Sequence, residues 1–149
     1  EMSNLLLALQ KGNLLIRRLW FLEWTHIITI CPKGRSLEYC TSKISQFYDE
    51  INTKFGNKTN LRILFNSESY SDGSGYHTHV NLNIENKKLQ PKILELLNQY
   101  FKNDRTEVDK YDFKRGFIFY SIKDFKDFKT ESWGFNGNNL KKEGLDYEV

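Results

Sequence analysis

Two of the chain's three histidines stand one residue apart, in the stretch GSGYHTHVNLNIE of residues 73–85. Successive side chains of a β-strand point to opposite faces, so His77, His79, Asn81 and Asn83 would share one face. The threonine and the apolar residues between them would point the other way, into a core. A solvated strand face needs polar residues but not histidine, whereas imidazole is a common ligand of divalent metal ions. The pair therefore fits a metal site, and the alternative is two solvated strand residues.

A carboxylate can join the two histidines across a hairpin. Asp72-Gly73 is a favoured two-residue turn, because both positions tolerate positive φ. With these residues as the turn, Glu68 would pair with His77, and such partners have Cβ atoms about 5 Å apart on the same face. Glu68, His77 and His79 would then offer three ligands to Mn²⁺, Mg²⁺, Co²⁺ or Zn²⁺ and leave positions open for a substrate. A longer loop would shift the register and leave Glu68 as a surface carboxylate.

The elements that must position these residues follow from hydrophobic periodicity. We expect strands within residues 20–30, 61–69, 77–84 and 106–113, and helices over residues 4–10, 37–55, 89–103 and 114–129. Ser36 can cap the helix over 37–55 and Gly56 can end it, while Pro91 suits the first turn of the next helix. The segment FIFYSI within 114–129 also has strand propensity. The polar tail over 130–149 is expected to be a loop leading out of the domain.

This order predicts an α+β fold, an antiparallel sheet with helices packed on one face, of the ferredoxin-like or RRM-like kind. We expect five strands in this sheet, of which the ranges above account for four. The other face of the sheet would be open to a long ligand. A chain of 149 residues suits one domain with a core.

The net charge of +3 fits contact with phosphate, although such a balance is common in proteins that never bind nucleic acid. Cys31 and Cys40 make neither a disulfide framework nor a paired metal motif, so a reducing, intracellular compartment is expected. No apolar run reaches membrane-spanning length, and no secretory signal or membrane partner is expected.

Four short motifs together resemble the HUH endonucleases, which start rolling-circle DNA replication. HTHV resembles the family's histidine–hydrophobic–histidine motif, and HIITI resembles its first motif, an apolar strand with a threonine, here Thr29. Glu68 stands nine residues before His77, where viral replication initiators often carry the third metal ligand. YSIK, residues 120–123, matches the Y-x-x-K motif of the nucleophile. The motifs occur in the family's order and span about residues 24–125.

Two features depart from the family's pattern. Thr78 occupies a position that is usually bulky and hydrophobic, although its methyl group can pack. The chain has no nucleoside-triphosphate-binding loop. The resemblance therefore implies a single nuclease domain over residues 1–149, the N-terminal part of a replication initiator that can continue into a C-terminal helicase.

The resemblance also implies a mechanism. Tyr120 would attack a phosphodiester of single-stranded DNA at a replication origin, leaving a 5′-phosphotyrosine and a free 3′-hydroxyl that can later rejoin the strands. Lys123, one helical turn away, would balance the developing negative charge. Glu68, His77 and His79 would hold the cofactor, Mn²⁺ or Mg²⁺. The candidates for contacting the DNA strand by stacking and phosphate contacts are Trp24, Lys58, Arg62 and Asn81.

Two other functions remain open. One is a non-catalytic sheet module that binds single-stranded nucleic acid by stacking bases on aromatic rings. The other is a two-histidine phosphoesterase acting on RNA ends, which would use paired H-x-T motifs. HIIT and HTHV resemble such motifs, but their spacing differs from that pattern in both copies. His26 itself is interpreted as structural or close to DNA rather than as a ligand. Metal dependence and a covalent DNA adduct distinguish the three functions.

Overall fold

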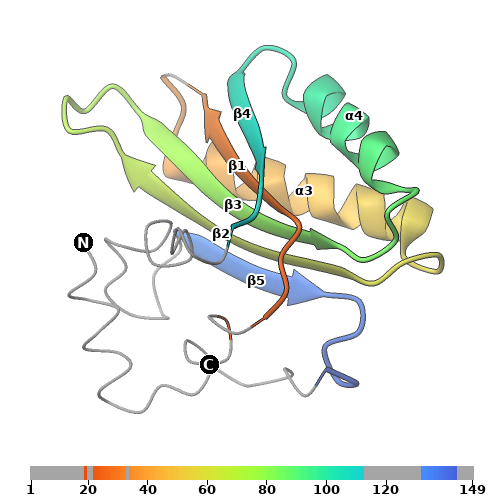
Figure 1. The fold of residues 1–149 in the computed structure, drawn as a ribbon. Coiled ribbons are helices and arrows are strands. Elements are labelled where there is room, and N and C mark those ends of the chain that lie inside the picture. Colours follow the sequence, from red (N-terminus) through yellow and green to blue (C-terminus); the bar gives the residue numbers. More distant parts are fainter. Residues whose placement is uncertain (1–18, 20–21, 33, 113–131, 144–149) are drawn as a thin grey trace, which may run out of the picture.

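The computed structural model describes residues 19, 22–32, 34–112 and 132–143, which build a five-stranded antiparallel sheet with two helices on one face (Figure 1). The elements in chain order are β1 (His26–Cys31), α3 (Leu37–Phe55), β2 (Leu61–Ser69), β3 (Tyr76–Ile84), α4 (Gln90–Tyr100), β4 (Arg105–Lys110) and β5 (Trp133–Gly137). The predicted α+β class and five-stranded antiparallel sheet are confirmed. The helices predicted over 4–10 and 114–129 lie outside the described residues.

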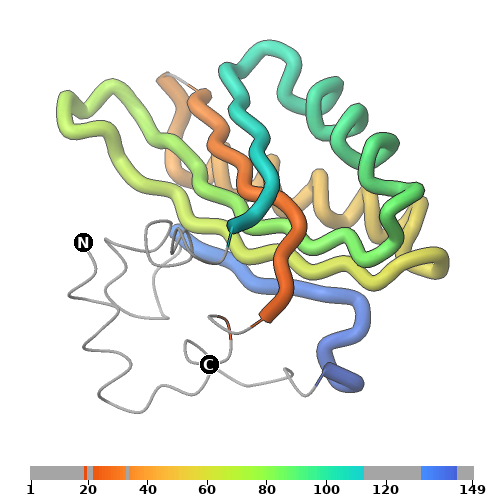
Figure 2. Tube along the Cα trace, in the orientation of Figure 1, coloured from red at the N-terminus to blue at the C-terminus, as the bar shows by residue number. Residues whose placement is uncertain are grey.

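The strand order β4-β1-β3-β2-β5 follows from two interleaved strand–helix–strand units. β1 and β2 are each antiparallel to β3, so they run parallel to one another with β3 between them, and α3 connects them. In the same way α4 connects β3 to β4 across β1. This is the split arrangement of ferredoxin-like folds, and the path of the chain can be followed in Figure 2. β5 adds a fifth strand beside β2.

The main core lies between the sheet and the helices. Apolar side chains alternate along β1, β2 and β3, so one face of each strand is buried against α3 and α4. The buried residues of this core include Ile28, Ile30, Ile44, Phe47, Ile51, Leu61, Ile63, Phe65, Val80, Leu82, Ile84, Ile93 and Leu97. Burying each such side chain stabilises the fold by about 1.5–3 kcal/mol relative to leaving it exposed. The apolar alternation therefore directs the intervening polar side chains to the opposite face.

Helix α3 begins and ends where the sequence predicts. The Ser36 hydroxyl oxygen accepts a hydrogen bond from the Tyr39 N–H at 3.1 Å, and Gly56 follows the last turn. Pro91 stands in the first turn of α4, where its missing N–H costs no hydrogen bond. Neither helix among the described residues is long and apolar enough to cross a membrane.

The expectation of a loop over the whole of 130–149 is wrong, because residues 133–137 form β5. Its Asn66↔Trp133 and Leu64↔Phe135 pairs extend the sheet beyond β2. Gly134 suggests a loop from sequence alone, yet in the structure it lies where the β5 backbone comes close to the Phe65 ring of β2. A Cβ there would lie 2.4 Å from the ring of Phe65. The glycine is needed for packing and not for a turn.

The sequence suggested that the face of the sheet away from the helices is open. In the structure, part of this face is covered. Leu19, Trp24 and Leu64 form a second buried apolar cluster there, with Trp133 and Phe135 packed against it. This cluster covers the part of the face beside β5. The polar residues of β2 and β3 on that face are also largely buried, including Asn66, His79 and Asn81.

Candidate metal centre

The predicted register of the β2–β3 hairpin is confirmed. Glu68 is the cross-strand partner of His77, and Asn66 is the partner of His79. Because partners across a strand pair share a face, Glu68 and both histidines project from the same side of the sheet, opposite the helices.

The turn that joins the strands is longer than expected. The Tyr70 N–H donates to the Gly75 carbonyl, and the Gly73 N–H donates back to the Tyr70 carbonyl, so four residues form the loop. Asp72 does not adopt the positive φ that a two-residue type I′ turn requires, whereas Gly73 has φ +74°. A two-residue and a four-residue loop with the same centre give the same pairing. The register is therefore correct although the predicted turn is wrong.

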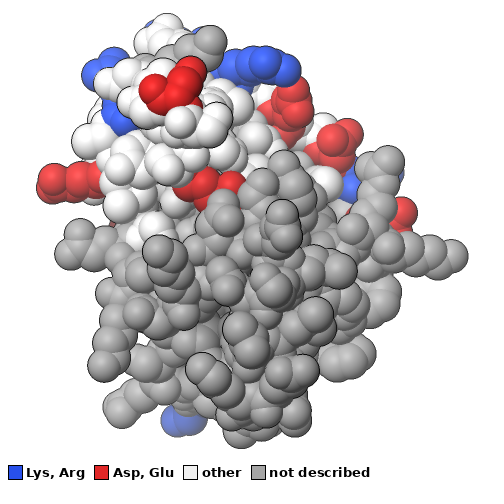
Figure 3. All heavy atoms as spheres, turned by 90° about the vertical axis from the view of Figure 1, so that its left-hand side faces the viewer, with Lys and Arg blue, Asp and Glu red and all other residues white. Residues whose placement is uncertain are grey.

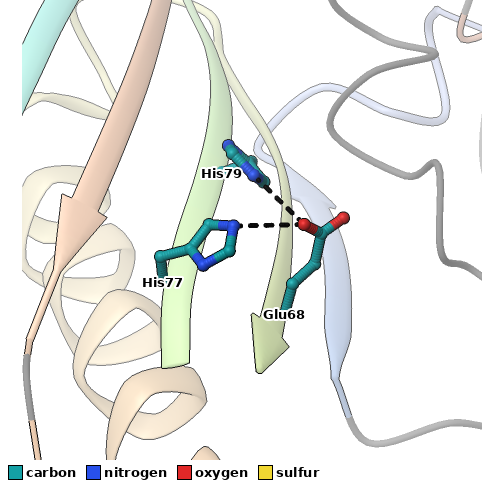
Figure 4. A group of neighbouring side chains, drawn as sticks. All are labelled: Glu68, His77 and His79. Carbon is teal, nitrogen blue, oxygen red and sulfur yellow. Dashed lines mark hydrogen bonds and ion pairs between the residues drawn. The ribbon is translucent and has the colours of Figure 1, made fainter. Parts of the chain in front are cut away.

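The three predicted ligands converge on one point (Figure 4). Glu68 Oε2 lies 3.1 Å from His77 Nε2 and 3.4 Å from His79 Nε2. All three ligand atoms lie within 4.8 Å of one another. Ligand bonds to a divalent ion are about 2.0–2.2 Å long, so neighbouring ligand atoms on one ion are separated by roughly 3 Å. The two distances from Glu68 match this separation.

Burial makes these three side chains an unusual group. The side chains of Glu68 and His79 are each 4% exposed, and that of His77 is 18% exposed. A buried carboxylate is costly unless a cation or hydrogen-bond donors compensate its charge. Two nitrogen donors and one oxygen donor suit Mn²⁺, Co²⁺ or Zn²⁺, and also Mg²⁺ when water completes the shell. The group could therefore hold a metal ion, with access from the side of His77.

Tyr70 extends the site in a direction that the sequence analysis missed. Its ring lies against His77, with 4.9 Å between the ring centroids and 41° between the planes. Burial, followed by a hydrogen bond with Cys31, raises the pKa of Tyr70 to about 12, so the residue remains a neutral phenol. Strand alternation could have found it, because residue 70 follows Glu68 on the same face.

The four residues proposed to contact DNA are placed differently from one another. Trp24 is buried and donates its indole N–H to the Leu19 carbonyl. Arg62 is buried beside it, with the guanidinium carbon 4.8 Å from the Trp24 ring centroid. Lys58 is exposed in the turn after α3, away from the candidate metal group of Glu68, His77 and His79, called the metal group below. Asn81 is fully buried and follows His79 on the same face of β3.

Arg62 is held by its own partners within the protein. The guanidinium forms an ion pair with Glu143 and donates a hydrogen bond to the Glu23 carbonyl. Burial lowers the pKa of Arg62, and the Glu143 carboxylate opposes that effect. The residue is therefore part of the packing between strand β2 and the segment after β5.

His26 lies on the other face of the sheet, because its partner in β3 is the core residue Leu82. Burial, and then the charge of Lys110, lowers the pKa of His26. Its Nδ1 lies 2.9 Å from the Thr25 hydroxyl, which donates its own proton to the Leu82 carbonyl. We therefore assign the His26 proton to Nδ1. This buried position on the helix face agrees with the interpretation of His26 as a structural residue rather than a metal ligand.

Fold and site together define an α+β protein whose antiparallel sheet carries a buried glutamate–histidine group that could hold a metal ion. No family model, curated protein or solved structure matches the chain. Tyr120 and Lys123, the predicted nucleophile and its partner, lie outside the described residues.

Proposed function

We propose that this domain nicks and rejoins single-stranded DNA by the HUH mechanism, to initiate rolling-circle replication. The observation that carries the proposal is the convergence of Glu68, His77 and His79 on one face of the sheet. The two histidines belong to the HTHV motif, and the glutamate is in the position that the family resemblance implies. A solvated strand face would explain none of this burial.

The chemistry fits the residues present. A bound divalent ion would act as a Lewis acid on a non-bridging phosphate oxygen, which makes an anionic phosphodiester easier to attack. The Tyr120 oxygen forms a bond to phosphorus and loses its proton, while the bond to the 3′-oxygen breaks and that oxygen takes up a proton. Lys123 balances the negative charge that develops during the transfer. The linkage retains the phosphodiester's energy, so attack by a 3′-hydroxyl reverses the reaction.

Of the two alternatives, the two-histidine phosphoesterase is disfavoured by the sheet register. That chemistry needs histidines from two motifs in one site, but His26 is on the opposite face from His77 and His79. The non-catalytic sheet module shares the fold and remains the second candidate. It gives no reason for burying a carboxylate between two imidazoles.

The decisive experiment separates a covalent product from simple binding. The protein is incubated with Mn²⁺ and a random pool of single-stranded oligonucleotides labelled at the 3′ end, and denaturing electrophoresis follows. We expect a slower, labelled protein band that needs metal, because a 5′-phosphotyrosine retains the 3′ fragment. Tyr120→Phe should abolish the band, and Tyr100→Phe, the same change on α4, should keep it.

Other results would change the proposal. A band that persists in Tyr120→Phe would assign the nucleophile to a different residue. An adduct carrying a 5′ label instead would contradict the polarity of the transfer. DNA binding without any adduct, on every sequence in the pool, would favour the sheet module.

A further inference from the structure

We propose that a second site, a hollow beside the metal group, binds a nucleotide of single-stranded DNA next to the phosphate that is cleaved. The inference rests on the proposed function. The hollow lies at the end of the sheet where β1 stops and β4 begins, and it has a volume of about 700 Å³. Its lining residues are Cys31, Arg35, Tyr39, Lys43, Tyr70, Asn103, Asp104, Arg105 and Glu107. This volume is within the range of sites that bind small molecules.

The hollow and the metal group share a wall. Tyr70 lines the hollow, and its ring lies against the imidazole of His77. One side chain therefore separates the candidate metal ligand His77 from the hollow. A hydrogen bond from the Gly34 N–H to the Ser74 carbonyl, 3.0 Å long, joins the loop after β1 to the hairpin loop. This contact ties together two of the segments that border the hollow before any DNA binds.

The charges of the lining suit a phosphate. Three basic side chains face two acidic ones. Lys43 is held in position by the Tyr39 hydroxyl at 3.0 Å and by Asp104 at 3.5 Å. Arg105 pairs with Glu107 only at the surface, where their side chains are 76% and 60% exposed. Such an exposed pair contributes little, so Arg105 can turn toward a phosphate at small cost.

The lining also offers surfaces on which a base can stack. The Arg35 guanidinium lies over the Tyr39 ring, 4.7 Å from its centroid, and Tyr70 provides a second ring. Sites for single-stranded nucleic acid combine such aromatic and arginine platforms with cations that follow the backbone. A nucleotide contains both chemical groups, a planar base and an anionic phosphate.

A larger cavity of about 860 Å³, beside Trp24 and Arg62, fits a phosphate less well. Three glutamates, Glu23, Glu85 and Glu143, line it with only two basic residues, of which Arg62 is already paired with Glu143. Basic and acidic side chains are also interspersed over the described surface on the side shown in Figure 3. Affinity for phosphate therefore depends on particular residues rather than on a uniform basic surface.

The test measures DNA binding without metal, so that it is independent of catalysis. The probe is a fluorescein-labelled random pool of single-stranded oligonucleotides, and anisotropy gives the dissociation constant. The Arg35→Ala/Arg105→Ala double variant, called the hollow variant, is compared with the Lys54→Ala/Lys92→Ala double variant, called the control variant. Both remove two exposed positive charges, but Lys54 and Lys92 lie in the last turn of α3 and the first turn of α4, away from the hollow. Thermal unfolding and Mn²⁺ binding check that each variant retains its fold and metal group.

We expect the hollow variant to bind about tenfold more weakly than the wild type, and with a shallower salt dependence, because it has lost charge-assisted phosphate contacts. The control variant should change by no more than about twofold, as expected for screened charges at a distance. Equal losses in the two variants, or no loss in the hollow variant, would overturn the inference. Failure of the proposed nicking activity would appear separately, as a wild type that forms no adduct with DNA.

Discussion

Glu68 and His77 are nine residues apart in sequence and directly opposite each other across the β2–β3 hairpin. The Glu68 Oε2 atom lies 3.1 Å from His77 Nε2, on the face of the sheet away from the helices. The apolar face of the same strands maintains this register, because a slip by one residue would turn Val80, Leu82 and Ile84 out of the core. The candidate metal centre thus depends on the packing of the opposite face.

Glu68→Gln should separate metal binding from stability. The carboxamide can still accept a hydrogen bond from an imidazole and leaves no buried charge, so the metal-free free energy of unfolding should change by only about 1 kcal/mol. The rise in Tm produced by Mn²⁺ should be lost. Circular dichroism melts with and without Mn²⁺ measure both effects. Glu107→Gln, at an exposed position on β4, is the control, and a full metal-induced shift in Glu68→Gln would refute the ligand assignment.

Gly134→Ala should destabilise the fold by about 1–3 kcal/mol, the usual cost of overpacking. The added methyl group would lie 2.4 Å from the Phe65 ring. Urea denaturation measures the loss. Combining the change with Phe65→Leu should restore part of the stability, so the double variant should be less destabilised than the sum of the single variants. Strict additivity would show that the contact between β5 and Phe65 does not limit the packing.

His26 should make the protein less stable in mild acid. Its pKa is lowered in the folded state from an ordinary value of 6.5, mainly by burial, so the unfolded chain binds a proton more readily. The contribution of neutral His26 to stability is therefore fully present above pH 6.5 and is lost as the pH falls toward the lowered pKa of the folded state. Urea titrations of the metal-free protein between about pH 7.5 and 5.5 should show a steeper loss for the wild type than for His26→Gln. Parallel curves for the two proteins would contradict a lowered pKa of His26 in the folded state.

Arg62→Met should destabilise the protein by about 2 kcal/mol, because it leaves the partly buried Glu143 carboxylate without its ion pair. Adding Glu143→Gln removes that charge and should recover part of the loss. Chemical denaturation of the two variants measures the difference. If Arg62 mainly contacts DNA, Arg62→Met would instead leave stability unchanged and weaken DNA binding alone.

Strand alternation predicted much of the fold and the convergence of the three candidate ligands. It is local in sequence, so it assigns Glu68, His77 and His79 to one face even when the turn between them is assigned incorrectly. The cap at Ser36 and the end of α3 are local in the same sense.

What the sequence could not predict depends on contacts between distant segments. Gly134 suggests a loop until Phe65, far away in the chain, is seen against it. Trp24 and Arg62 resemble exposed DNA contacts until Leu19 and Glu143 are found beside them. The hollow next to Tyr70 combines four separate segments, so no single stretch of sequence indicates it.

The most direct test of the metal centre is Mn²⁺ binding by isothermal titration calorimetry. The wild type and His26→Gln should bind a single ion with the same affinity, because the third histidine lies on the opposite face of the sheet. His77→Ala removes a ligand near the surface and should weaken binding by about tenfold or more. Equal binding by all three proteins, or no binding by the wild type, would contradict a metal centre formed by Glu68, His77 and His79.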